Sequence, residues 1–124
     1  MIDAEQALAD YRRRHAGTPH LSGRHRYEQH APELIRCTIR PATAESWLQS
    51  HFTTPRTKEI LLEISARFAA LMEAGAWQDR GDEDPVVVHA RANRAGRIVW
   101  NGAHRLGAVM LLGRPFDLPI RFCR

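Results

Sequence analysis

Lysine, cysteine and long apolar runs are all scarce in this chain of 124 residues. No hydrophobic stretch approaches the roughly 20 residues of a membrane-spanning helix. The N-terminal stretch "MIDAEQALADYRRR" has no apolar core of the kind that an export signal needs. The two cysteines, Cys37 and Cys123, show neither CxxC nor metal-ligand spacing, so we expect two separate free thiols and no metal site. These absences favour a cytoplasmic protein without membrane contact.

Arginine carries almost all of the positive charge. Lys58 is the only lysine among 18 basic residues, and the net charge is +4 with a pI of about 9.8. A basic surplus favours an anionic partner such as a nucleotide, a nucleic acid or a phosphorylated substrate. The remaining composition, with 44% hydrophobic and 26% charged residues, is that of an ordinary globular domain.

The N-terminal region, residues 1–30, combines a helix with a basic arm. The pattern predicts a helix over Asp3–Arg14, capped by Asp3 with Gln6 three residues later, and with an apolar stripe. That stripe consists of Ala4, Ala7, Leu8 and Tyr11. Glycine and proline then predict a loop.

Histidines recur every five residues in this arm, at His15, His20, His25 and His30. No regular element places that spacing on one face, so we interpret the arm as a solvated basic loop rather than a metal site. The alternative is an arm that contacts phosphates nonspecifically. Its arginines are Arg12, Arg13, Arg14, Arg24 and Arg26.

Residues 31–124 read as one α+β domain. "ELIRCTIR" predicts a half-buried strand with Cys37 facing inward, and "PATAESWLQSHF" predicts a short helix with Thr43 as its cap. The clearest helix spans Thr57–Ala74 and ends at Gly75; its apolar stripe is interpreted as core. The stripe comprises Ile60, Leu61, Ile64, Phe68, Leu71 and Met72.

The C-terminal half alternates strands with one helix. "VVVHA" and "RIVW" predict two strands joined by the turn "RANRAG", in which Gly96 suits a hairpin-like connection. "AHRLGAVMLLG" has helical spacing and ends at Gly113, and "LPIRF" predicts the last strand. Together these elements predict a small mixed sheet flanked by helices.

The stretch "NGAHR" carries the strongest chemical signal. A glycine turn that leads into a helix presents unpaired backbone N–H groups and the positive end of the helix dipole, which together suit an anion. Gly102 would allow a ligand close to the backbone, Arg105 would clasp phosphate oxygens, and His104 would donate a hydrogen bond or move a proton. The alternative is that Arg105 pairs with the acidic loop after Trp77 while His104 caps a strand end.

"GRIVWNGAHRLGAVMLLGRPFDLPIRF" resembles the ParB/sulfiredoxin-like superfamily, in which a strand leads through a Gly-x-His-Arg turn into a helix that grips phosphate. The resemblance covers Ile35 to Phe122, and it is closest to the phage and actinobacterial ParB-like nuclease-domain branch with its G-x-H-R-L motif. It rests on nine residues taken in order: Met72, Gly75, Trp77, Gly96, Arg97, Gly102, His104, Arg105 and Leu106. It implies a nucleotide, ATP or ADP above all, whose phosphates lie on Asn101, Gly102, Ala103, His104 and Arg105, with Mg²⁺ bridging the phosphates.

Two departures from the family pattern narrow this expectation. Ala103 stands where sulfiredoxins carry a reactive cysteine, which argues against that thiol chemistry. Asn101 replaces the usual aspartate and cannot serve as a carboxylate base or as a strong Mg²⁺ ligand. Substitute carboxylates lie in the acidic loop at Asp79, Asp82, Glu83 and Asp84. Among them we take Glu83 and Asp82 as candidate catalytic residues beside His104 and Arg105.

Three functions follow from this reading. The first is a nucleotide-dependent phosphotransferase or NTPase that acts on a hydroxyl of a small molecule or a protein. The second is a noncatalytic module that binds a nucleotide or a partner, which Asn101 and Ala103 favour. The third is a nonspecific DNA-binding protein of the partition or phage type; no helix after Phe122 could read bases, so we expect backbone contacts alone.

Overall fold

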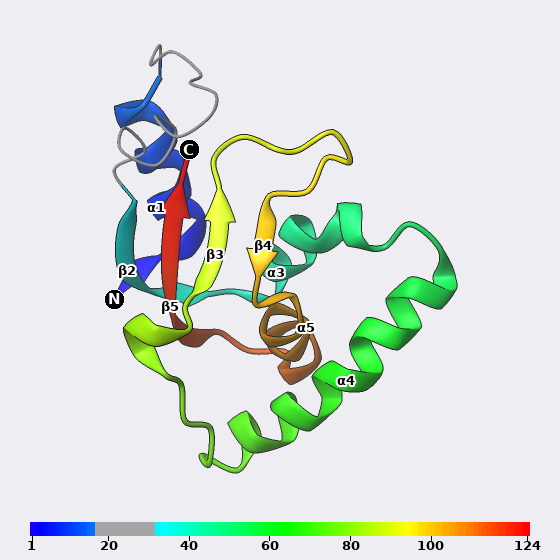
Figure 1. Cartoon of the computed structure of the whole chain (residues 1–124). Coiled ribbons are helices and arrows are strands. Elements are labelled where there is room, and N and C mark those ends of the chain that lie inside the picture. The colour runs from blue at the N-terminus through cyan, green and yellow to red at the C-terminus, as the bar shows by residue number, and fades with distance from the viewer. Residues whose placement is uncertain (17–31) are drawn as a thin grey trace.

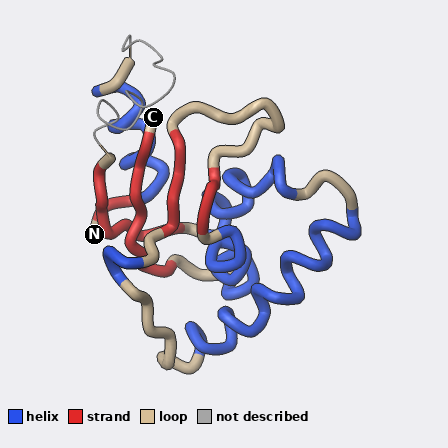
Figure 2. The backbone as a smooth tube through the Cα atoms, in the orientation of Figure 1, coloured by secondary structure: helices blue, strands red, loops and turns tan. Residues whose placement is uncertain are grey.

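One mixed five-stranded sheet organises the part of the chain that the computed structural model describes, residues 1–16 and 32–124. In the order β1-β2-β5-β3-β4, β2 pairs antiparallel with β5, β3 parallel with β5, and β4 antiparallel with β3. Figure 2 shows the strands of this sheet in red. The strands are β1 Ile2–Asp3, β2 Glu33–Ile39, β3 Val86–His89, β4 Val99–Asn101 and β5 Phe116–Cys123. The expected α+β class with a mixed sheet is confirmed.

The helices gather around this sheet. In Figure 1, α1 lies beside β2 and β5, whereas α3, α4 and α5 group at the other end of the sheet. The helices are α1 Ala4–Arg14, α3 Pro41–Leu48, α4 Pro55–Glu73 and α5 Ala103–Leu112, with 3₁₀ turns η1 Gln49–His51 and η2 Gly81–Glu83. None of these described helices is both long and apolar enough to cross a membrane.

One face of the sheet is buried, and the other, the open face, is partly exposed. Alternate residues of neighbouring strands share the buried face, which joins one core with residues from α1, α3 and α5. The buried strand residues are Cys37, Ile39, Val86, Val88, Val99, Leu118, Ile120 and Phe122. On the opposite face Arg36 and Trp100 are exposed. Since side chains alternate along a strand, an exposed residue such as Trp100 beside buried Val99 marks the open face.

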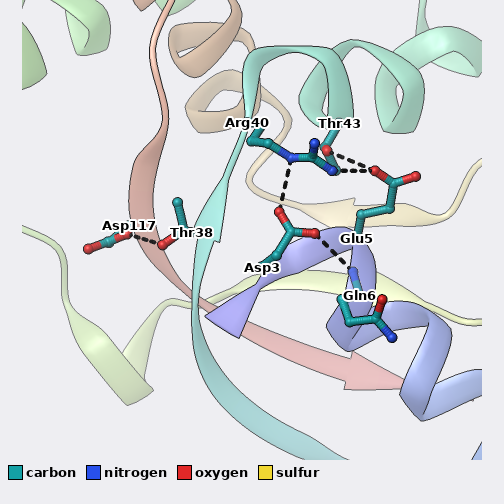
Figure 3. Close-up of polar contacts among 7 residues, drawn as sticks. All are labelled: Asp3, Glu5, Gln6, Thr38, Arg40, Thr43 and Asp117. Carbon is teal, nitrogen blue, oxygen red and sulfur yellow. Dashed lines mark hydrogen bonds and ion pairs between the residues drawn. The ribbon is translucent and has the colours of Figure 1, made fainter. Parts of the chain in front are cut away.

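The N-terminal helix belongs to the same core. Asp3 caps α1 by accepting a hydrogen bond from the Gln6 amide at 3.1 Å, as expected, and the predicted apolar stripe is buried. β1 pairs with β2, and Asp3 and Glu5 both accept hydrogen bonds from Arg40, at 3.0 and 2.8 Å (Figure 3). The helix that the sequence analysis grouped with residues 1–30 therefore packs with residues 32–124.

The expected cap of α3 was wrong. Arg40 is the N-cap residue and Pro41 occupies the first turn, because its fixed φ starts the helix before Thr43 is reached. Thr43 lies buried inside the helix, where its hydroxyl donates a hydrogen bond to Glu5 at 3.4 Å (Figure 3). Thr43 thus ties α3 to α1.

The interpretation of the α4 stripe as core was only half right. α4 begins at Pro55, capped by Thr54, and ends before Gly75, which has φ of +71°. Its inner side is formed by Leu61, Ser65, Phe68 and Met72, whereas Ile60, Ile64 and Leu71 are exposed. The pattern marked both rows as apolar, but α4 packs on α5 along one row only, so the other row is left in solvent.

Both cysteines are free thiols, as expected. Cys37 is fully buried on the inner side of β2, and burial raises its pKa to about 11. A thiol with so high a pKa is almost entirely protonated at neutral pH and acts as a small apolar side chain.

Candidate functional site

The predicted turn lies where β4 passes into α5. Gly102 adopts a left-handed conformation with φ of +92°, and α5 starts at Ala103 without a side-chain cap. In the described part of the chain, the first α5 amide with a backbone partner is that of Leu106, which donates to the Gly102 carbonyl at 3.0 Å. The amides of Ala103, His104 and Arg105 therefore form the open N-terminus of the helix.

The role expected for Gly102 changes. A Cβ built on Gly102 would lie 2.8 Å from Cγ2 of Val86 and 3.0 Å from Nη2 of Arg105. Glycine is needed here because the turn packs closely on β3 and because its φ is positive. The missing Cβ faces the protein interior, so it does not by itself bring a ligand closer to the backbone.

Arg105 turns inward. Only 6% of the residue is exposed, and its guanidinium donates to the Asp84 carbonyl at 2.5 Å and to the Pro85 carbonyl at 3.3 Å. Nη2 also lies 3.5 Å from Oδ1 of Asp84. Burial lowers the pKa of Arg105, and the carboxylates of Asp84 and Asp79 act in the opposite direction. Of the two alternatives that the sequence left open for Arg105, pairing with the acidic loop is the one observed.

Asn101 fastens the same loop. Its Nδ2 donates to Oδ1 of Asp84 at 2.8 Å and to the Pro85 carbonyl at 3.0 Å. An amide supplies these two donated hydrogen bonds, and an ionised carboxylate could not. The amide of Asn101 therefore suits the loop that this chain places opposite the turn.

Asp84 is the acidic residue that meets the turn. Asp82 and Glu83 lie exposed in η2, and within the described residues neither accepts a hydrogen bond from the turn. The sequence named all four acids of the loop, but it ranked Glu83 and Asp82 first as catalytic residues. Asp84 meets the turn because its neighbour Pro85 leads straight into β3, which brings Asp84 against β4.

Asp79 holds the start of the acidic loop. Its carboxylate accepts hydrogen bonds from Arg36 at 2.9 Å and from the Gly81 amide at 3.0 Å. The Arg36 hydrogen bond is the main cause that lowers the pKa of Asp79, with a smaller contribution from the Gly81 amide. Asp79 therefore stays ionised and serves as a structural anchor of the loop.

His104 is the turn side chain that is not tied to the acidic loop. It is half-buried at the second position of α5, and in the described residues its ring takes part in no recorded hydrogen bond, so the strand-end cap is not observed. Its ring can therefore turn toward an anion bound at the helix N-terminus.

The basic arm is described only in part. Arg12 donates to the Ala90 carbonyl at 3.1 Å, Arg13 pairs with Asp10 at 2.6 Å, and Arg14 pairs with Glu33. All three arginines are exposed residues despite these contacts. Arg24 and Arg26 lie outside the described residues, as do three of the four histidines of the arm, His20, His25 and His30.

One pocket was not expected from the sequence. A pocket of about 610 Å³ lies near the ends of β3 and β5, and it is lined by His89, Arg91, Ala92, Asn93, Arg94, Trp100 and Arg124. Trp100 is 56% exposed, with its ring centroid 4.6 Å from that of His89. The available signal was the alternation of β4, which turns Trp100 away from the core that holds Val99.

Among residues 1–16 and 32–124, no three His, Cys, Asp or Glu side chains are grouped so as to hold a metal ion. Searches against protein-family models, curated proteins and solved structures found no match to this chain. The interpretation of the turn therefore depends on its geometry alone. The turn combines an open helix N-terminus, a half-buried histidine, and an acidic loop held in place by Asn101 and Arg105.

Proposed function

We propose that this chain binds a nucleotide, ATP or ADP in the first place, through phosphates placed at the N-terminus of α5. The observation that carries the proposal is the start of α5, where Gly102 enters the helix with positive φ and no side chain caps it. Three backbone amides and the positive end of the helix dipole meet at that point. A phosphate group is the anion that such a terminus commonly receives.

The residues of the turn divide into two roles under this proposal. The amides of Ala103 and His104 contact phosphate oxygens, and the His104 ring adds a donor. Asn101 and Arg105 act as positioning residues, because their hydrogen bonds hold Asp84 and Pro85 in place. Mg²⁺ would arrive bound to the nucleotide, because the only carboxylate next to the turn among the described residues is that of Asp84. The positive charge of Mg²⁺ would offset the negative charge of Asp84.

Binding without fast turnover is the form of the proposal that the contacts favour. Asp82 and Glu83 have no hydrogen bond to the turn, and Oδ1 of Asp84 already accepts a hydrogen bond from Asn101. A phosphotransferase or NTPase acting on a small-molecule or protein hydroxyl is the second candidate. The observation in its favour is that the Asp84 side chain is 48% exposed beside the turn and could orient a hydroxyl or water.

A thermal-shift panel with ATP, ADP, CTP and GTP plus Mg²⁺ tests the binding proposal. The variant of choice is His104→Glu, because an acidic residue in the first turn stabilises a helix while it repels a bound phosphate. Ala66→Glu, on the exposed side of α4, adds the same charge away from the turn. We expect at least one nucleotide to raise the Tm of the wild type and of Ala66→Glu, with little response from His104→Glu.

The proposal fails if no nucleotide raises the Tm of the wild type, or if His104→Glu responds as the wild type does. Turnover is measured separately, as product released from the stabilising nucleotide over hours. Product formation by the wild type that stops in a folded Asp84→Asn variant would establish the second candidate. Binding with no product supports the noncatalytic form.

A further inference from the structure

The open face of the sheet presents basic and aromatic side chains together. Arg121 on β5, His89 on β3 and Trp100 on β4 all alternate with buried neighbours, so their side chains leave the core on the same face. The rings of Trp100 and His89 contact each other in a tilted arrangement with their centroids 4.6 Å apart, and more than half of Trp100 is exposed. A large, exposed aromatic ring on a sheet can serve as a platform for a planar ligand.

Positive charge frames this platform. The connection from β3 to β4 carries Arg91 and Arg94, both exposed, which line the pocket of about 610 Å³ beside Trp100. Of the described residues that line the pocket, none has an acidic side chain. A ligand that combines flat rings with negative charge therefore fits this site better than an apolar one does.

The basic surface extends beyond this pocket toward α1. A second pocket of about 160 Å³ shares Arg91 and Arg124 with the first and adds Arg12, His15, Ala16 and Ala90. Arg12 reaches across to the Ala90 carbonyl at 3.1 Å, which fixes the position of α1 beside the strand connection. Figure 1 shows the end of α1, the end of β5 and the end of β3 side by side. Because the two pockets share Arg91 and Arg124, the basic surface extends from Trp100 to α1.

We propose that this face binds single-stranded nucleic acid, with one base stacked on Trp100 and flanking phosphates contacted by Arg94 and Arg91. Stacking on exposed aromatic rings together with a basic track is how proteins bind single strands without sequence preference. Duplex bases are already stacked on each other, so Trp100 cannot reach a base face in a duplex. The site uses none of the residues of the NGAHR turn, which begins directly after Trp100.

Fluorescence anisotropy of a labelled oligothymidylate 12-mer, with the full chain, tests the proposal. Trp100→Ala should weaken binding by roughly 10-fold or more, whereas Trp100→Phe, which keeps a stacking ring, should stay within about 3-fold of the wild type. Arg94→Ala should weaken binding and reduce the slope of log affinity against log salt by about 0.7, the value for one phosphate contact on a single strand. Arg67→Ala, which removes the same charge from the exposed side of α4, should bind as the wild type does.

Parallel titrations identify the ligand. An oligouridylate 12-mer shows whether RNA is preferred over DNA, and binding of either strand supports the proposal. Absence of binding to both strands, or Trp100→Ala binding like the wild type, would overturn it. The proposal would also be overturned if a 12-base-pair duplex or polyglutamate bound with the same affinity, or if Arg67→Ala and Arg94→Ala had equal effects. Each of these results would mean charge attraction without base stacking. His104→Glu should bind the oligonucleotide normally, so this test and the nucleotide test fail independently.

Discussion

Replacing Asn101 with aspartate should destabilise this protein. The amide of Asn101 donates to Oδ1 of Asp84 at 2.8 Å and to the Pro85 carbonyl at 3.0 Å. Asn101→Asp removes both donors and sets two carboxylates against each other. Asn101→Ala removes the same donors without adding charge, so it is the matched control.

The size of the effect follows from these contacts. Two hydrogen bonds contribute about 1 kcal/mol each, so Asn101→Ala should lower the free energy of unfolding by about 2 kcal/mol. Two unit charges at the observed 2.8 Å repel by about 1.5 kcal/mol in water and about 6 kcal/mol at an effective dielectric constant near 20. Asp84 is about half exposed, so the lower value applies. We expect Asn101→Asp to cost about 3–4 kcal/mol at pH 7.

Urea unfolding followed by far-UV circular dichroism at pH 7.5 and pH 4.5 measures both contributions, the lost hydrogen bonds and the charge repulsion. Repulsion raises the pKa of one carboxyl in the folded variant above its unfolded value, so its cost is present above the folded pKa and is relieved as the pH falls through it. The difference between Asn101→Asp and Asn101→Ala should therefore shrink at pH 4.5. Equal stability of Asn101→Asp and the wild type at pH 7.5 would refute the role assigned to Asn101.

Two further predictions concern the packing and the pH dependence of the fold. In Gly107→Ala the new Cβ would lie 2.2 Å from Oγ of Ser65, so the free energy of unfolding, measured in urea, should fall by about 1–3 kcal/mol. Adding Ser65→Gly should restore part of the loss. An unchanged unfolding midpoint in the single variant would show that α4 and α5 are not in such close contact. Burial, with a smaller contribution from Arg97, lowers the pKa of His51 below 6.5. As the pH falls, the unfolded state binds the His51 proton before the folded state does, so the free energy of unfolding should fall as the pH drops from 6.5 toward 5 and stay level above 6.5. This dependence on pH should be weaker in His51→Asn. An identical dependence in both proteins would contradict the lowered pKa of His51.

Local patterns allowed much of the fold to be predicted. Asp3 lies directly before an amphipathic stretch and caps α1, and the alternation of β2 correctly placed Cys37 inside. α5 begins after Gly102 and ends before Gly113, and both glycines have a positive φ. Glycines on either side of a stretch with helical spacing had indicated these two ends. Each of these features depends on residues within one or two turns of the chain.

Features that depend on distant packing were harder to predict. The row of α4 that contains Ile64 looks as apolar as the row that contains Phe68, and only the position of α5 decides which is buried. Arg105 was expected to face a ligand, but Pro85 and Asp84 offer its guanidinium acceptors that come from 20 residues away. Trp100 lines one pocket together with His89 and Arg94. The alternation within a single strand does not predict that these three residues lie together.

The backbone amides at the start of α5 are the atoms on which we propose that the nucleotide phosphates lie. A titration of the ¹⁵N-labelled protein with ATP and Mg²⁺, followed by two-dimensional NMR, tests this claim at those atoms. The amide signals of Ala103 and His104 should shift most, and those of Trp100 and Arg94 should stay in place. No shift at Ala103 and His104 at millimolar ATP, or shifts confined to the pocket beside Trp100, would contradict the claim.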